Sequence, residues 1–283
     1  IGKDIHITCW GDSLTAGGGW TTTLAALSGA TVHNGGTGGE NARCIAARQG
    51  ADVMTINNIT IPAECEPVTI AVRAEDTGIT TEWGYKVTPL LQGGSHVNPV
   101  DIGCVLGTLR WTGANYADQT GIWTFTRSEA GEEVAITRPT AIRTAFARER
   151  NGKSEIMVIF IGQNGGYTDI DDLIRTHRLM IDHFKGKEYV ILGLSSGTAA
   201  QRADYEAAMT EAFGRRFVSL RAYLAHPIYD TDGKTIISCY GLDDAGLDPT
   251  DADIERIKNG QVPQTLLSDS VHYTAATKTV IGT

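Results

Sequence analysis

Apolar runs with strand character alternate with helical patterns in two separate blocks of the chain. The first block predicts strands at residues 5–10 and 31–33, and helices at residues 21–27 and 41–49. The second block predicts strands at 155–161, 189–194 and 217–220, and helices at 171–184 and 199–213. Residues 156–161 are apolar throughout, which is typical of a strand covered on both faces. The alternation therefore predicts an α/β fold with a doubly wound parallel sheet.

A different pattern lies between the two blocks. Short stretches alternate between apolar and polar residues with a period of two, and Gly, Asn, Asp and Pro separate them. They predict strands at residues 68–73, 83–87, 103–111, 122–126 and 134–137. We expect one α/β domain, formed by residues 1–61 and 145–283, with a small all-β insertion at 62–144. The insertion should leave the sheet at the edge opposite Ser13, because the helix at 41–49 runs back to that edge.

The last part of the chain is less regular. Turn-forming residues at 229–234 lie between apolar residues, so they predict a hairpin. A short helix is expected at residues 249–259, with Asp248 as its N-cap and Pro249 at its first position.

Composition and charge exclude some classes of function. The 283 residues are 41% hydrophobic and carry a formal net charge of −9. Nucleic-acid binding requires clustered Lys and Arg, so we expect no nucleic-acid partner. No apolar run approaches the 18 residues that predict a membrane span.

The cysteines and the N-terminus of the chain give indications of the protein's cellular location. The five cysteines predict buried thiols, with Cys65–Cys104 as the one pair considered for a disulfide. The chain starts at Ile1 and not at Met, and residues 58–60 fit a glycosylation acceptor. We expect trimmed ends or a processed N-terminus, and a secreted or cell-surface location is slightly favoured over a cytoplasmic one.

Ser13 has the sequence context of a catalytic nucleophile. It follows the first predicted strand and precedes a helix, so it should lie at the carboxyl end of the sheet, where open α/β sheets bind ligands. A serine needs a base to become nucleophilic, and His272 is the natural base. Asp269 precedes His272 by three residues, which allows its carboxylate to orient the imidazole.

Two further segments can supply hydrogen-bond donors to an oxyanion. Attack of a serine on an ester produces a tetrahedral oxyanion, which fixed N–H groups stabilise. The glycine-rich loop at residues 34–41 presents the backbone N–H of Gly39 without side-chain obstruction. The side-chain amide of Asn164 and the backbone N–H of Ser13 complete a set of three donors.

Together these segments resemble the SGNH hydrolases, also called GDSL esterases and lipases. Gly-Asp-Ser-Leu at residues 11–14 resembles the first block of that family, and residues 34–41 resemble the second. Gly-Gln-Asn at 162–164 and Asp-Ser-Val-His at 269–272 resemble the remaining two. The chain departs from the family at Gly165, where Asp is usual, and at Tyr273, which we interpret as part of the pocket wall. The resemblance does not extend to the insertion.

The resemblance implies a fold, an activity and roles for single residues. The fold is a flavodoxin-like sheet of strand order 2-1-3-4-5. Ser13 attacks, His272 is the base, Asp269 orients it, and Ser13, Gly39 and Asn164 form the oxyanion hole. No metal or cofactor is required. The expected substrate is a small-molecule or carbohydrate ester with a short acyl group such as acetyl.

Two other functions are compatible with the sequence. Gly-Leu-Ser-Ser-Gly at residues 193–197 matches the nucleophile elbow of α/β-hydrolases, and Ser195 could act with Asp243 or Asp244 and His272. Asp269 could then merely cap a helix near Thr274. Alternatively, the insertion could be a carbohydrate-binding or oligomerisation module in a protein without catalysis. Its aromatic residues could stack on sugars: Trp83, Tyr85, Trp111, Tyr116 and Trp123.

Overall fold

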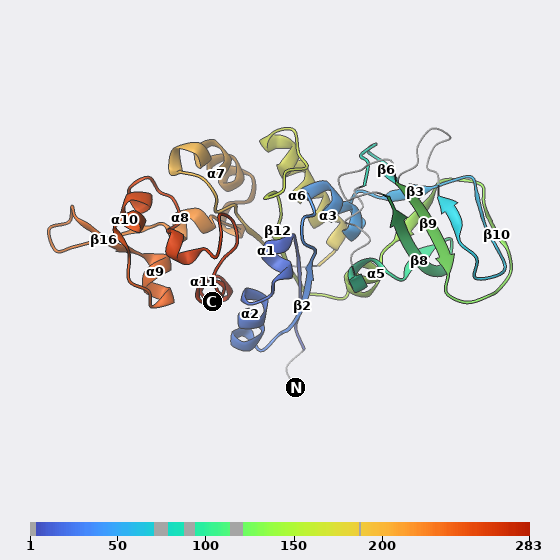
Figure 1. Ribbon diagram of the computed structural model, residues 1–283, viewed down its shortest axis with the longest axis horizontal. Helices are drawn as coiled ribbons and strands as arrows, with labels where there is room; N and C mark the ends of the chain where they lie inside the picture. The colour runs from blue at the N-terminus through green and yellow to red at the C-terminus, as the bar shows by residue number, and fades with distance from the viewer. Residues whose placement is uncertain (1–3, 71–78, 88–93, 114–120, 187) are drawn as a thin grey trace.

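The computed structural model describes the chain except for residues 1–3, 71–78, 88–93, 114–120 and 187. Its α/β part lies beside a β-rich part, which forms one end of an elongated molecule (Figure 1). The opposite end carries the hairpin of β15 (Pro227–Tyr229) and β16 (Ile236–Cys239), which confirms the predicted hairpin.

Five parallel strands form the central sheet, in the order β2-β1-β12-β13-β14. They are β1 (His6–Gly11), β2 (Thr31–Gly36), β12 (Ile156–Phe160), β13 (Glu188–Leu192) and β14 (Phe217–Val218). Parallel pairing joins all four neighbouring pairs of strands. The predicted parallel α/β sheet is therefore confirmed, and its five strands are those that the apolar runs indicated.

Helices cover both faces of this sheet. Trp10, Met157 and Ile159 point to one face and pack with helices of that side. These helices are α3 (Ala42–Gln49), α5 (Ala145–Arg150), α6 (Ile170–Phe184) and α7 (Ala199–Phe213). Cys9 and Phe160 point to the other face. Its helices are α1 (Ser13–Ala16), α2 (Trp20–Ser28), α8 (Leu220–Leu224), α9 (Tyr240–Ala245), α10 (Asp251–Lys258) and α11 (Ala275–Gly282). Strand β12 is thus buried on both sides, as its apolar sequence requires.

The β-rich part is a curled antiparallel sheet of order β5-β9-β8-β7-β11-β3-β6, beside the pair β10–β4. The strands are β3 (Met54–Ile56), β4 (Ile59–Ile61), β5 (Val68–Ile70), β6 (Thr80–Thr81), β7 (Val100–Ile102), β8 (Val105–Thr112), β9 (Ile122–Arg127), β10 (Val134–Ile136) and β11 (Thr140–Arg143). A single helical turn, α4 (Gly94–Val97), precedes β7. The division at residues 62 and 144 stays a prediction, although strand pairing begins earlier, at Met54.

Two expectations about the β-rich part are wrong, and a third falls on residues that the structure does not describe. Residues 83–87 do not form a continuous strand, because Gly84 takes a φ of +82° in a turn that reverses the chain, after which Lys86 pairs with Thr80. Trp111 and Trp123 are buried in the local hydrophobic core, so they are not free to stack on a sugar. Tyr116 and residues 71–73 of one expected strand lie outside the described residues.

The insertion leaves the α/β part where the topology predicts. Helix α3 ends at Gln49, with Gly50 as its C-cap, and the first strand of the β-rich part follows a few residues later. Among the described residues, we find no hydrogen bond, ion pair or ring contact between the β-rich part and Ser13. However, the turn at residues 82–85 packs beside Arg43 in the first turn of α3 and Arg175 in the first half of α6. The insertion therefore extends back along these helices and does not stay at the opposite edge.

Two local details differ from expectation. The N-cap of α10 is Thr250 and not Asp248, because Thr250 and Asp253 cap each other in a reciprocal pair. The Cys65–Cys104 disulfide is absent, since both thiols are exposed and unpaired, whereas Cys9, Cys44 and Cys239 are buried.

Within the described residues, no helix combines the length and apolar character needed to cross a bilayer.

Candidate active site

Ser13 lies at the carboxyl end of the central strand β1, as the first residue of the short helix α1. The carboxylate Oδ1 of Asp12 accepts a hydrogen bond of 2.9 Å from Leu14 N and so fixes the start of this helix. On the neighbouring strand, Gly36 allows α1 to pack closely, because an added Cβ would lie 2.1 Å from Ala16 N. The Ser13 side chain is half-buried, so its hydroxyl is both fixed and reachable.

His272 reaches Ser13 from a loop close to the other end of the chain. Its Nε2 lies 2.9 Å from Ser13 Oγ, and its Nδ1 lies 2.7 Å from Asp269 Oδ2. Ser268 N donates to the carbonyl oxygen of His272 at 2.8 Å and closes the loop that holds both residues. The structure therefore places Ser13, His272 and Asp269 in one hydrogen-bonded chain.

Asp269 is held by its own loop. Its Oδ1 accepts backbone hydrogen bonds of 2.7 Å from both Val271 and His272. These backbone hydrogen bonds, together with the His272 side chain, lower the pKa of Asp269 to about 2. The carboxylate is therefore charged at neutral pH. Asp269 does not cap the helix that follows, because Thr274 is the N-cap of α11.

Two of the three predicted oxyanion donors, Gly39 N and the Asn164 amide, lie on loops that contact each other. Asn164 Nδ2 donates to the carbonyl oxygen of Glu40 at 3.0 Å, and Ala42 N donates to that of Gly165 at 3.0 Å. An added Cβ at Gly38 would lie 4.0 Å from Ser13 Cβ, so the glycine loop borders the nucleophile. A side-chain amide has two N–H groups. One N–H of Asn164 binds Glu40, and the other is available to a ligand.

The backbone donors of this set are unoccupied. Within the part of the chain that the structure describes, neither Ser13 N nor Gly39 N donates a hydrogen bond. Gly39 takes a φ of +76°, a conformation that favours glycine. Free N–H groups on a fixed loop are the donors that an oxyanion requires.

The sequence did not reveal three buried charged residues, Asp12 beside the nucleophile and the pair Glu40 and Arg48. Asp12 is 1% exposed, and burial raises its pKa to about 6, although the Leu14 N–H and the charge of His272 act in the opposite direction. Glu40 and Arg48 form a fully buried ion pair, with Arg48 Nε 2.8 Å from Glu40 Oε2. No helical spacing could have suggested this pair, because Glu40 precedes Asn41, the N-cap of α3, whereas Arg48 lies in the last turn of the helix.

Ser195 does not contact His272. It is 6% exposed, and its Oγ accepts a hydrogen bond of 2.5 Å from the hydroxyl of Tyr273. Asp244 instead accepts a hydrogen bond from Tyr223. Because both ring nitrogens of His272 already bind Asp269 and Ser13, the geometry does not favour the Ser195 alternative. Tyr273 itself is 2% exposed, so it belongs to the core. The expectation that it forms part of a pocket wall is therefore wrong.

This arrangement has the parts that activate a serine. A base within hydrogen-bond distance can take the hydroxyl proton, and a carboxylate behind it stabilises the imidazolium that forms. In the described residues, no three His, Cys, Asp or Glu side chains are grouped so that they could hold a metal ion. Neither protein-family models nor curated proteins gave a match to this chain.

Proposed function

We propose that the protein is a serine-dependent ester hydrolase of the SGNH (GDSL) type. The observation that carries the proposal is the chain Asp269–His272–Ser13, with distances of 2.7 Å and 2.9 Å, beside unoccupied backbone donors. The sheet order β2-β1-β12-β13-β14 supports it, because this is the order 2-1-3-4-5 that the resemblance implies. In that order the loops after β1, β2 and β12 meet at the point where the strand order reverses.

In the proposed mechanism, Ser13 Oγ attacks the ester carbonyl carbon and its proton passes to His272 Nε2. The carbonyl oxygen becomes an oxyanion, which accepts hydrogen bonds from Ser13 N, Gly39 N and the Asn164 amide. When the tetrahedral species collapses, the imidazolium protonates the leaving alcohol and an acyl-serine remains. A water molecule, deprotonated by His272, then releases the carboxylic acid and restores Ser13.

We propose a short acyl group such as acetyl, on a carbohydrate or another small alcohol. Asp269 and His272 are 54% and 43% exposed, so the site is open on the leaving-group side. An apolar cleft of about 420 Å³ lies between α2, α8 and α11. Its lining does not include Ser13, Gly39, Asn164 or His272, so it gives no support for a long acyl tunnel.

A panel of esters tests this proposal. p-Nitrophenyl esters from acetyl to dodecanoyl are assayed beside acetylated polysaccharides, with acetate release as the readout. The proposal predicts the highest kcat/KM for the shortest acyl groups and release of acetate from at least one polysaccharide. A folded protein that hydrolyses no ester in the panel would contradict it, and a preference for long chains would contradict the substrate class alone.

A further inference from the structure

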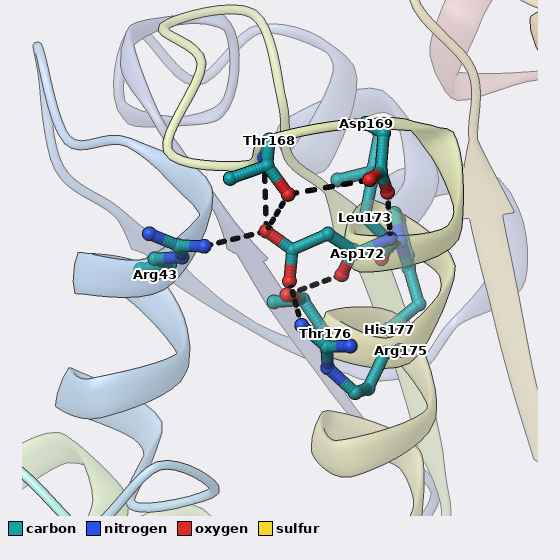
Figure 2. A network of polar contacts seen from close by, with 8 residues as sticks. All are labelled: Arg43, Thr168, Asp169, Asp172, Leu173, Arg175, Thr176 and His177. Carbon is teal, nitrogen blue, oxygen red and sulfur yellow. Dashed lines mark hydrogen bonds and ion pairs between the residues drawn. The ribbon is translucent and has the colours of Figure 1, made fainter. Parts of the chain in front are cut away.

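A buried carboxylate, Asp172, connects the end of the loop that carries Asn164 to the helix that follows the loop of Gly39. It lies in the first turn of α6 and is 3% exposed. Its Oδ2 accepts hydrogen bonds from Arg43 at 2.5 Å and from Thr168 N at 2.9 Å, and its Oδ1 accepts one from Arg175 (Figure 2). We call these four residues the Asp172 cluster. Although burial alone would raise the pKa of Asp172, hydrogen bonds from Thr168 and Arg43 lower it.

The position of each partner explains why the Asp172 cluster matters. Arg43 belongs to the first turn of α3, directly after the glycine loop that ends at Asn41. Thr168 belongs to the end of the loop that carries Asn164. One carboxylate oxygen therefore ties the helix after the first loop to the end of the second loop. Asn164 Nδ2 to Glu40 O and Ala42 N to Gly165 O form a second connection between the same loops.

The loop with Asn164 needs such external support. Gly165 and Gly166 follow Asn164, with φ values of +69° and +83°. Two consecutive glycines have no side chains that could fix the loop by packing, and glycine has the largest conformational freedom. The Asn164 amide must nevertheless stay within hydrogen-bond distance of the oxyanion position to act as a donor.

The β-rich part covers the outer side of the Asp172 cluster. The guanidinium carbon of Arg43 lies 3.3 Å from the centre of the Tyr85 ring, and that of Arg175 lies 5.4 Å from the centre of the Trp83 ring. The turn that carries both rings is held by Glu82 N, which donates to Val53 O at 2.9 Å. The two arginines thus lie between aromatic rings on one side and the Asp172 carboxylate on the other.

We propose that Arg43 and Asp172 are positioning residues for the oxyanion hole, and that Tyr85 of the β-rich part holds Arg43 in place. This proposal rests on the proposed function, because the oxyanion hole is part of it. Neither Arg43 nor Asp172 touches the reacting atoms. Their loss should reduce kcat much more than it changes KM, because the oxyanion forms only in the transition state. A donor displaced by about 1 Å can reduce the rate about 100-fold.

The test combines kinetics with hydrogen exchange. Asp172→Asn, Arg43→Gln and Tyr85→Leu are compared with wild type on p-nitrophenyl acetate, or on the best substrate of the ester panel. Arg110→Gln and Tyr229→Leu are matched controls, because both side chains are exposed and outside the Asp172 cluster. We expect kcat to fall about 10- to 100-fold in Asp172→Asn and Arg43→Gln, with KM changed less than about threefold. Tyr85→Leu should lower kcat by less than these two substitutions do. Tyr85→Phe should have a kcat close to that of wild type. Arg43→Lys should have a kcat between those of Arg43→Gln and wild type.

Hydrogen exchange reports on the loops without depending on activity. Amides at residues 37–42 and 162–168 should exchange faster in Asp172→Asn and Arg43→Gln, and the controls should match wild type. Unchanged exchange in both loops, or a fall in kcat equal to that of the controls, would overturn the positioning role. A wild-type protein without esterase activity would instead overturn the proposed function and the oxyanion role with it. Faster exchange in that case would show only that the Asp172 cluster holds the loops.

Discussion

Nε2 of His272 lies 2.9 Å from Oγ of Ser13, although 259 residues separate the two in the chain. Asp269 continues this contact on the other side of the ring, where its Oδ2 lies 2.7 Å from Nδ1. The two contacts assign one role to each atom: the hydroxyl attacks, Nε2 takes its proton, and Nδ1 keeps its own for Asp269.

Removal of the charge on Asp269 should reduce catalysis and leave the fold intact. In Asp269→Asn the imidazole loses the carboxylate that selects its tautomer, and we expect kcat to fall about 10⁴-fold. Ester hydrolysis measures the loss, and circular dichroism checks the fold. Asp251→Asn is a suitable control, because this exposed carboxylate begins α10. A loss under tenfold would show that Asp269 does not support His272.

Asn164 should contribute to the rate through the oxyanion. Asn164→Ala removes one donor, for which we expect a fall in kcat of about 10²- to 10³-fold with little change in KM. Gln163→Ala tests the neighbouring amide, whose Oε1 accepts a hydrogen bond of 3.5 Å from Ser196. Steady-state kinetics of both variants test this prediction. An equal fall in kcat in the two variants would argue against an oxyanion role for Asn164.

Asp12 should make stability depend on pH. Burial raises its pKa from the ordinary 3.8 of an aspartate to about 6, so the folded protein holds this proton more tightly than the unfolded chain does. The resulting stabilisation is complete below pH 3.8 and is lost as the pH rises through 6. The shift corresponds to about 3 kcal/mol.

Asp12→Asn provides the measurement for that pH effect. Asparagine retains an oxygen that can cap Leu14 N but carries no charge. Urea denaturation at pH 4, 5, 6 and 7 should therefore show that the variant gains stability relative to wild type between pH 4 and 6. A difference between the two proteins that stays constant over this range would mean that Asp12 does not titrate there.

The buried pair of Glu40 and Arg48 should be sensitive to loss of one partner. Arg48→Met leaves the Glu40 carboxylate buried without its cation, which should lower the free energy of unfolding by about 3–5 kcal/mol. The double substitution Glu40→Gln with Arg48→Met removes both charges and should be less destabilised than the single one. Urea denaturation of all three proteins tests this, and an equal loss in both variants would contradict it.

The sequence was informative where local signals determine the structure. Residues 156–161 are continuously apolar, and β12 is the strand buried on both faces that this pattern predicts. The signals at Ser13 and His272 are local as well, because glycines, a strand and an Asp at a fixed spacing predict these residues as a nucleophile and its base. Such signals depend on neighbours in the chain, so one sequence is sufficient to find them.

Contacts between distant segments could not be predicted in the same way. Arg43 and Asp172 are 129 residues apart, and nothing near either residue indicates the other. The alternation at residues 83–87 suggested a strand, but Gly84 makes a turn there, and Trp83 and Tyr85 both face arginines of the α/β part. Tertiary contacts outweighed the local β preference at this point.

The most direct test of the central claim is covalent labelling of the nucleophile. The protein is incubated with a fluorophosphonate, which reacts with activated serines, and mass spectrometry of its peptides locates the adduct. We predict one adduct, on Ser13, that is lost in Ser13→Ala together with ester hydrolysis, a loss on the order of 10⁶-fold. Ser195→Ala should keep both the adduct and most of the activity. An adduct on Ser195, or full ester hydrolysis by Ser13→Ala, would contradict the assignment of Ser13 as the nucleophile.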